Sequence, residues 1–402
     1  MKKIILLMLI FITGCTSRQN IETIIVQEKI EEKAENVLTE EFVDNKIKNM
    51  TMDEKIGQMI IIYNYTTNYN ENLKNDIIKY QPGGFIVFSE NAESFIQLSN
   101  LIENMQEDSK IPMLISVDQE GGRVQRLTYL NDTSFTIIPP MKYVGEKNNK
   151  ELSYSIGKVL GSELNTLGIN MDFAPVIDIA SNPYNNVISD RAFGNNADIV
   201  SGMSISLAEG LQDENIIPVY KHFPGHGDTL ADSHYSLPVL NKSKEELKNL
   251  ELIPFKEAIK NDAQIIMVGH ISIPKISGNT PASLSKEVIT NILRKELNFN
   301  GVVITDAINM GAVTNNYSEK ETIIMAINAG VDIILMPTSI ENAINYIKDG
   351  LNENRITEEQ INNSVKRIIT LKYQNNLFLK NKRNNKNIIG SIEHKNIANN
   401  AY

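Results

Sequence analysis

The chain has 402 residues, of which 42% are hydrophobic and 22% are charged, and its formal net charge is −10. This length and hydrophobic content suit a large globular core, either one barrel or two smaller domains. An acidic chain without a basic stripe outside its tail is not typical of nucleic-acid-binding proteins, so we expect no nucleic-acid partner.

The first 14 residues have the pattern of a signal peptide. Lys2 and Lys3 precede the apolar run IILLMLIFI, which is too short for a membrane-spanning helix. Cys15 follows Ile-Thr-Gly and is the only cysteine, so no intramolecular disulfide can form. The segment resembles a bacterial lipoprotein signal. This resemblance implies cleavage before Cys15, lipid on its thiol, and a place in the bacterial cell envelope, anchored to a membrane.

Composition divides the rest of the chain into three parts. Residues 15–45 are polar and rich in Glu, which predicts a tether between the membrane and the folded domain. Residues 46–375 contain the apolar segments of a single large domain. Residues 376–402 are rich in Asn and Lys, and we expect a loosely ordered polar tail there.

The large domain alternates strand-length apolar runs with helix-length amphipathic segments. Eight runs are rich in Ile and Val, as parallel strands buried on both faces should be: IGQMIIIY, GGFIVF, PMLISVD, INMDFAPVIDI, IIPVYKHF, AQIIMVGHI, GVVITDAI and VDIILMP. Eight β/α units predict an α/β fold of the (β/α)8, TIM-like barrel type. A doubly wound open sheet is the alternative.

Titratable side chains at the strand ends favour the barrel. Five of the runs carry such groups at or near their C-terminal ends, namely Asp118, Asp178, Lys221 with His222, His270 and Asp306. In a barrel these ends converge on one face, where active sites lie, whereas an open sheet would spread them along an edge.

Residues 221–234, KHFPGHGDTLADSH, contain three of the five histidines. Gly and Pro make this segment unlikely to be the interior of a helix or strand, and loops on a rigid scaffold are where catalytic groups are placed. A solvated polar loop would not explain why the histidines gather here. Asp232, two residues before His234 in the chain, could orient the imidazole and raise its pKa, which suits a general acid and base.

The same segment leaves a metal site open as an alternative. His222, His226 and His234, with Asp228 or Asp232, could ligate zinc. Their spacing matches no metal signature, and no HExxH motif occurs, so we expect no metal. His226 has no assigned chemistry and is expected to shape the loop.

Three further motifs contain candidate ligand-binding groups. In DQEGGRVQRL, Asp118 and Arg126 are expected to contact a ligand, and Arg123 is expected to form a structural ion pair. Arg191 of SDRAFG needs a buried acceptor, and substrate binding and structural pairing are both open for it. Asp306 ends GVVIT and is either a helix N-cap or a catalytic carboxylate, but the small residues after it favour a pocket.

Six motifs follow one another along the chain: DQEGGRVQRL, NMDFAPVIDI, SDRAFG, KHFPGHGDTLADSH, GHI and ITDAINMGAV. In this order they resemble the motifs of family 3 glycoside hydrolases, in the β-N-acetylglucosaminidase branch. The resemblance implies a TIM-like barrel and a retaining mechanism without metal or organic cofactor. It implies Asp306 as the nucleophile and His234, backed by Asp232, as the acid/base. Sugar contacts are implied for Asp118, Arg126, Arg191, Lys221 and His222.

The resemblance therefore implies a retaining exo-β-N-acetylglucosaminidase that acts on muropeptides or chitooligosaccharides as a monomer. Its partners would be the glycan and, through the lipid on Cys15, a membrane. Phosphorolysis remains an alternative, as do a metal-dependent hydrolase and a non-catalytic glycan-binding lipoprotein. The tail resembles the approach to the second domain of longer family members.

Overall fold

The computed structural model describes residues 37–229, 237–379 and 383–402. The predictions made for Cys15, Asp232 and His234 lie outside these residues.

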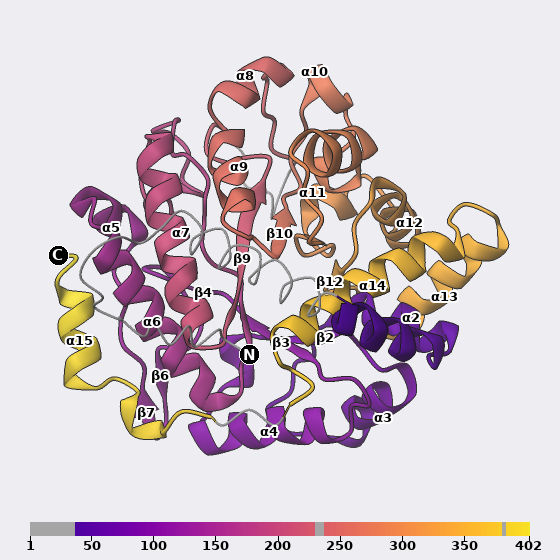
Figure 1. Cartoon of the computed structure of the whole chain (residues 1–402), viewed down its shortest axis with the longest axis horizontal. Coiled ribbons are helices and arrows are strands. Elements are labelled where there is room, and N and C mark those ends of the chain that lie inside the picture. Colours follow the sequence, from indigo (N-terminus) through magenta and orange to yellow (C-terminus); the bar gives the residue numbers. More distant parts are fainter. Residues whose placement is uncertain (1–36, 230–236, 380–382) are drawn as a thin grey trace, which may run out of the picture.

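A parallel eight-stranded barrel forms the centre of the molecule (Figure 1). Its strands pair in chain order, from β1 to β2, β3, β8, β9, β10, β11 and β12, and β12 pairs with β1. The bridge between Ile304 and Ile333 joins the last two strands. The (β/α)8 barrel is therefore confirmed, and the open sheet is excluded.

The barrel strands are β1 (Ile60–Ile62), β2 (Gly84–Val87), β3 (Leu114–Val117), β8 (Met171–Asp172), β9 (Ile217–Phe223), β10 (Ile265–Val268), β11 (Val302–Thr305) and β12 (Ile334–Leu335). Every residue in them is buried, because helices cover the outside and side chains fill the inside. Two small hairpins follow β3, namely β4 (Gln119–Gly121) with β5 (Val124–Gln125) and β6 (Tyr129–Leu130) with β7 (Thr133–Ser134).

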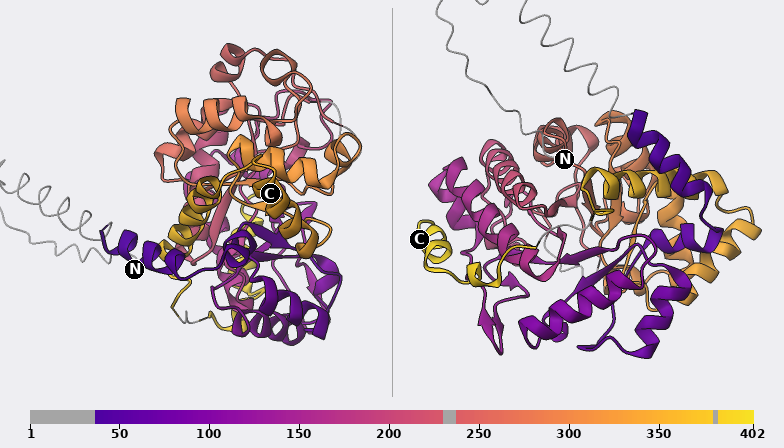
Figure 2. Two further views of the ribbon diagram at one scale, coloured as in Figure 1. Left: turned by 90° about the vertical axis from the view of Figure 1, so that its right-hand side faces the viewer. Right: turned by 60° about the horizontal axis from the view of Figure 1, so that its bottom comes forward.

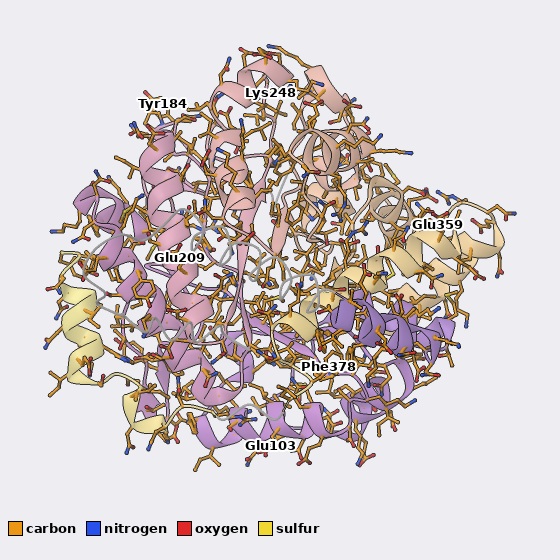
Figure 3. The ribbon with its side chains drawn as sticks, viewed as in Figure 1. Glu103, Tyr184, Glu209, Lys248, Glu359 and Phe378 are labelled. Atoms are coloured by element: carbon orange, nitrogen blue, oxygen red, sulfur yellow. The ribbon has the colours of Figure 1, made fainter. Side chains whose placement is uncertain are left out.

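Helices surround the barrel, and charged side chains such as Glu103, Lys248 and Glu359 project from them into solvent (Figure 3). The helices of the first half are α2 (Met52–Gln58), α3 (Glu71–Tyr80), η1 (Ser89–Asn91), α4 (Phe95–Glu107), α5 (Met141–Lys147), α6 (Lys150–Leu167), η2 (Ser189–Arg191) and α7 (Ala197–Asp213). Those of the second half are α8 (Lys244–Asn249), α9 (Leu252–Lys260), α10 (Pro274–Ser277), η3 (Ala282–Leu284), the π-helical η4 (Glu287–Glu296), α11 (Gly311–Thr314), α12 (Glu319–Ala329), α13 (Ile340–Asn352), α14 (Glu358–Gln374), η5 (Lys386–Ile388) and α15 (Ile392–Asn399).

Local sequence explains where these helices begin and end. Thr357 caps α14 by accepting from the Gln360 backbone, and the Gln360 side chain accepts from the Thr357 backbone in return. α6 ends at Gly168, whose φ of 86° lies in the left-handed region that glycine adopts without strain.

The described part of the predicted tether packs on the barrel. Residues 37–48 are helical, and Val43 in this segment is fully buried. The Phe42 ring lies 4.5 Å from that of Tyr373 and 5.0 Å from that of Phe378. Among the described residues, no helix is long and apolar enough to cross a membrane.

The C-terminal segment is more ordered than its composition suggests. η5 and α15 lie along α6 on the outside of the barrel (Figures 1 and 2). Glu163 of α6 is buried and accepts hydrogen bonds from Gly390 and His394. The expectation of a loosely ordered tail is therefore wrong for residues 383–402, because a few specific contacts hold this polar segment.

Candidate active site

A cavity of about 290 Å³ lies at the C-terminal ends of the barrel strands. Six residues predicted from the sequence line it together, namely Asp118, Arg126, Arg191, Lys221, His222 and Asp306. They come from β9 itself and from segments that follow β3, β8 and β11, so the barrel brings together groups that are far apart in the chain. The site also contains Glu120, His226 and several apolar side chains.

Lys221 is the centre of a buried ion-pair network. Its Nζ lies 2.8 Å from Oδ1 of Asp118 and 2.6 Å from Oε1 of Glu120. Glu120 also forms a bidentate pair with Arg191, at 2.8 Å for both contacts. Burial opposes ionisation of Glu120, but Arg191 and Lys221 hold the pKa of its carboxyl well below its ordinary value. The network therefore stays charged and rigid near neutral pH.

The two arginines of the DQEGGRVQRL motif have different surroundings. Arg126 lines the cavity, lies over the Phe88 ring, and approaches Asp118 at 3.3 Å. Its Nε is buried without a hydrogen-bond partner. Arg123 pairs with Asp190 at 3.0 Å and donates to two backbone carbonyls of the 186–187 turn. The structural pairing predicted for Arg123 is confirmed.

Asp178 organises the histidines at the end of β9. Its Oδ2 lies 2.7 Å from Nδ1 of His222, and its Oδ1 accepts from the His226 backbone at 2.7 Å. Because a carboxylate accepts a proton donor, the His222 ring presents its Nε2 side to the rest of the site. Burial and the neighbouring His222 lower the pKa of His226 to about 4, so that His226 is neutral. These contacts of His226 agree with the structural role expected for it.

Asp306 follows β11 and is partly exposed to the cavity. The Ala307 backbone N–H donates to its Oδ1 at 2.8 Å. Burial opposes ionisation of this carboxyl, but His270, His222, the Ala307 N–H and Lys221 together hold its pKa below its ordinary value. Asp306 is therefore a carboxylate at neutral pH and can act as a nucleophile.

Sequence reasoning assigned no role to three groups that hold the site together. Glu120 is the acceptor that Arg191 needs, and its position between Asp118 and Gly121 was the available signal. Asp178 follows β8 and His270 follows β10, and neither side chain lines the cavity. Asp172, the last residue of β8, is a further buried acid. Burial raises its pKa well above the ordinary value, which favours its uncharged form beside the network.

The described residues contain no group of three or more His, Cys, Asp or Glu side chains that could hold a metal ion. The histidine-rich segment is only partly described, since residues 230–236 lie outside the structure's described ranges.

A barrel whose strand ends enclose a charged carboxylate and fixed polar groups defines an enzyme with a site for a small polar ligand. The pattern of the glycosyl hydrolase family 3 N terminal domain matches residues 51–371. The chain therefore belongs to this family, as its motifs predict.

Relatives and solved structures agree with this assignment. The chain is 34% identical over 322 residues to beta-hexosaminidase A of Pseudoalteromonas piscicida, covering 74% of this chain but only 54% of that protein. It is 35% identical over 260 residues to a beta-hexosaminidase of Methylobacillus flagellatus, covering 63% of this chain and 73% of that protein.

The structure of a family 3 beta-N-acetylglucosaminidase from Paenibacillus sp. superposes with a TM-score of 0.82. It is 34% identical, and the match covers 88% of this chain and 68% of that one.

Proposed function

We propose that this protein is a retaining exo-β-N-acetylglucosaminidase. The observation that carries the proposal is Asp306, a carboxylate with a lowered pKa that lines the cavity together with Lys221 and His222. The names of the relatives, beta-hexosaminidase and beta-N-acetylglucosaminidase, support the same substrate class.

The size of the cavity supports removal of one terminal sugar. Its volume of about 290 Å³ is at the low end of ligand pockets, which span roughly 300–1,000 Å³. Such a cavity suits one sugar ring better than a length of polysaccharide. Asp118, Lys221 and His222 offer both acceptors and donors, which suits the hydroxyls and the acetamide of N-acetylglucosamine.

The proposed reaction has two steps. Asp306 attacks the anomeric carbon and forms a glycosyl-enzyme ester, while protonated His234, held by Asp232, gives its proton to the leaving oxygen. Neutral His234 then takes a proton from water, which breaks the ester and releases the sugar with retained configuration. Asp232 and His234 belong to this proposal through the D-S-H motif alone.

The N-terminal pattern suggests where the enzyme would work. Lipid on Cys15 would anchor the chain to a membrane of the cell envelope, where muropeptides are present. Muropeptides and chitooligosaccharides are therefore the two natural substrates to compare, with the protein acting as a monomer.

The test is turnover of an aryl β-N-acetylglucosaminide by the wild type, Asp306→Asn and His234→Ala. We expect Asp306→Asn to lose at least a thousandfold in kcat, because the nucleophile is gone. His234→Ala should lose less with an activated aryl leaving group, which needs little protonation. Wild-type turnover by Asp306→Asn would refute the assignment, and loss of activity on chelation would favour the metal-dependent alternative.

The product separates hydrolysis from phosphorolysis. A beta-glucoside phosphorylase shares the fold, with a TM-score of 0.82 at 24% identity, covering 90% of this chain and 66% of that one. Turnover in phosphate buffer should give free N-acetylglucosamine for a hydrolase and the sugar 1-phosphate for a phosphorylase. Binding of the glycoside without any product would instead indicate a glycan-binding lipoprotein.

A further inference from the structure

His270 is a fully buried side chain that the proposed reaction does not use. It lies two residues after β10, and none of its surface is exposed. It does not line the cavity. Both of its ring nitrogens are engaged: Nδ1 lies 2.6 Å from Oγ of Ser283, and Nε2 lies 3.0 Å from the backbone oxygen of Ala307.

These two contacts define the proton positions on the ring. A backbone carbonyl can only accept a hydrogen bond, so Nε2 must carry the proton that it shares with Ala307. In the neutral ring, Nδ1 is then an acceptor, and the Ser283 hydroxyl donates to it. Burial lowers the pKa of His270, although the charge of Asp306 opposes this, and the two contacts are compatible with the neutral form.

Ala307 connects this ring to the carboxylate of the site. Its carbonyl accepts from His270, and its N–H donates to Oδ1 of Asp306 at 2.8 Å. A continuous chain of hydrogen bonds and one residue of backbone thus runs from Ser283 through His270 and Ala307 to Asp306.

We propose that His270 is a positioning residue for Asp306, and that Ser283 fixes the His270 tautomer that does so. This inference rests on the proposed function, in which Asp306 is the nucleophile. By holding the Ala307 backbone, His270 keeps the N–H aimed at Oδ1, which orients the carboxylate and favours its ionised form. The alternative is that both nitrogens are paired only because a buried ring must satisfy its polar atoms.

Two substitutions of His270 separate these possibilities. The amide nitrogen of Gln can take the place of Nε2 and keep a donor to the Ala307 carbonyl, whereas Asn reaches only as far as Nδ1. For Ser283→Ala the matched control is Ser277→Ala, because the Ser277 hydroxyl donates to the backbone of Thr280 and not to the ring. Each variant is assayed as the full chain for kcat, KM and the pH dependence of kcat/KM.

We expect His270→Asn to lower kcat about tenfold to a hundredfold, the range for one buried hydrogen bond, with KM within about threefold. The acidic limb of kcat/KM should move to higher pH, since a poorly aimed N–H stabilises the Asp306 carboxylate less. His270→Gln should keep most of the wild-type kcat and leave the acidic limb of kcat/KM near its wild-type pH. Ser283→Ala should lower kcat several-fold, and Ser277→Ala should not.

A folded His270→Asn variant with wild-type kcat and an unmoved acidic limb would overturn the inference. Where His270 variants do not fold, Ser283→Ala tests the inference instead. A Ser283→Ala variant with unchanged kcat and an unchanged pH profile would equally overturn the positioning role of His270. Failure here is distinct from failure of the proposed function. An inactive Asp306→Asn beside normal His270 and Ser283 variants rejects only the positioning role, whereas an active Asp306→Asn rejects the function itself.

Discussion

Glu120 is the side chain on which the charge balance of the cavity depends. It is 2% exposed and neutralises both Arg191 and Lys221 through three contacts between 2.6 and 2.8 Å. Removing one member of a buried ion-pair network leaves the others buried without a countercharge, which costs far more than loss of a surface pair. The carboxylate therefore stabilises the fold as well as the positions of the two cations.

We predict that Glu120→Gln lowers the free energy of unfolding by about 3–5 kcal/mol at pH 7 and raises KM. Urea unfolding measures the first effect and steady-state kinetics the second. Glu257→Gln is the matched control, because its pair with Lys260 is largely exposed and is worth at most about 1 kcal/mol. Equal losses of unfolding free energy in Glu120→Gln and Glu257→Gln would contradict the stabilising role of the buried ion-pair network.

The lowered pKa of Glu120 also predicts a pH dependence. Its folded pKa lies below the ordinary 4.5, so its stabilising contribution is present above pH 4.5 and is lost as the pH falls toward the folded pKa. The difference in unfolding free energy between the wild type and Glu120→Gln should shrink over this range. A difference that stays constant on acidification would show that the carboxyl titrates normally in the folded protein.

Among the elements, α14 makes an unusual contact with the N-terminal end of the barrel. Its Lys372 is fully buried and donates to Oε1 of Gln58 at 2.6 Å and to the Gly83 carbonyl at 2.9 Å. Both acceptors are neutral. Burial lowers the pKa of Lys372 to about 7 from its ordinary 10.5.

This burial predicts that stability rises with pH through Lys372. Between about pH 7 and 10.5 the unfolded chain holds a proton on Lys372 that the folded chain has released, so the unfolding free energy increases with pH. The slope is at most about 1.4 kcal/mol per pH unit. Urea unfolding should show it in the wild type and not in Lys372→Met. Lys366→Met, at a partly exposed site of the same helix, should keep the slope. Parallel curves for wild type and Lys372→Met would contradict the prediction.

In the molecule as a whole, the C-terminal segment, residues 383–402, packs against the outside of the barrel, away from the cavity, and stabilises it there. Glu163 accepts from the Gly390 N–H at 2.9 Å and lies 2.8 Å from Nδ1 of His394. We predict that removing residues 383–402 lowers the unfolding free energy by about 2–4 kcal/mol, because it removes these contacts and α15. The kcat of the folded protein should not change.

Chemical unfolding and an aryl glycoside assay on the truncated chain check this prediction. His394→Ala should show a smaller part of the same loss. A truncated chain of full stability would mean that the segment contributes nothing, and a large fall in kcat would mean that it supports the site.

The barrel was predictable because its signal is local. Each of the eight apolar runs carries its own strand pattern, and Asp118, Lys221 and Asp306 lie in or directly after their strands in the chain. The partners within the site were not predictable in this way. Glu120 and Arg191 are 71 residues apart, and only the closed barrel brings them together. The docking of α15 was also missed, because a polar composition does not reveal a few specific contacts with Glu163.

The most direct test of the account is to find the covalent intermediate. The enzyme is quenched with acid during turnover of an aryl β-N-acetylglucosaminide, digested, and analysed by mass spectrometry. We predict one N-acetylhexosamine attached to the peptide that contains Asp306, and none in Asp306→Asn. Turnover by the wild type with no adduct and an inverted product, or with the sugar on another residue, would contradict Asp306 as the nucleophile.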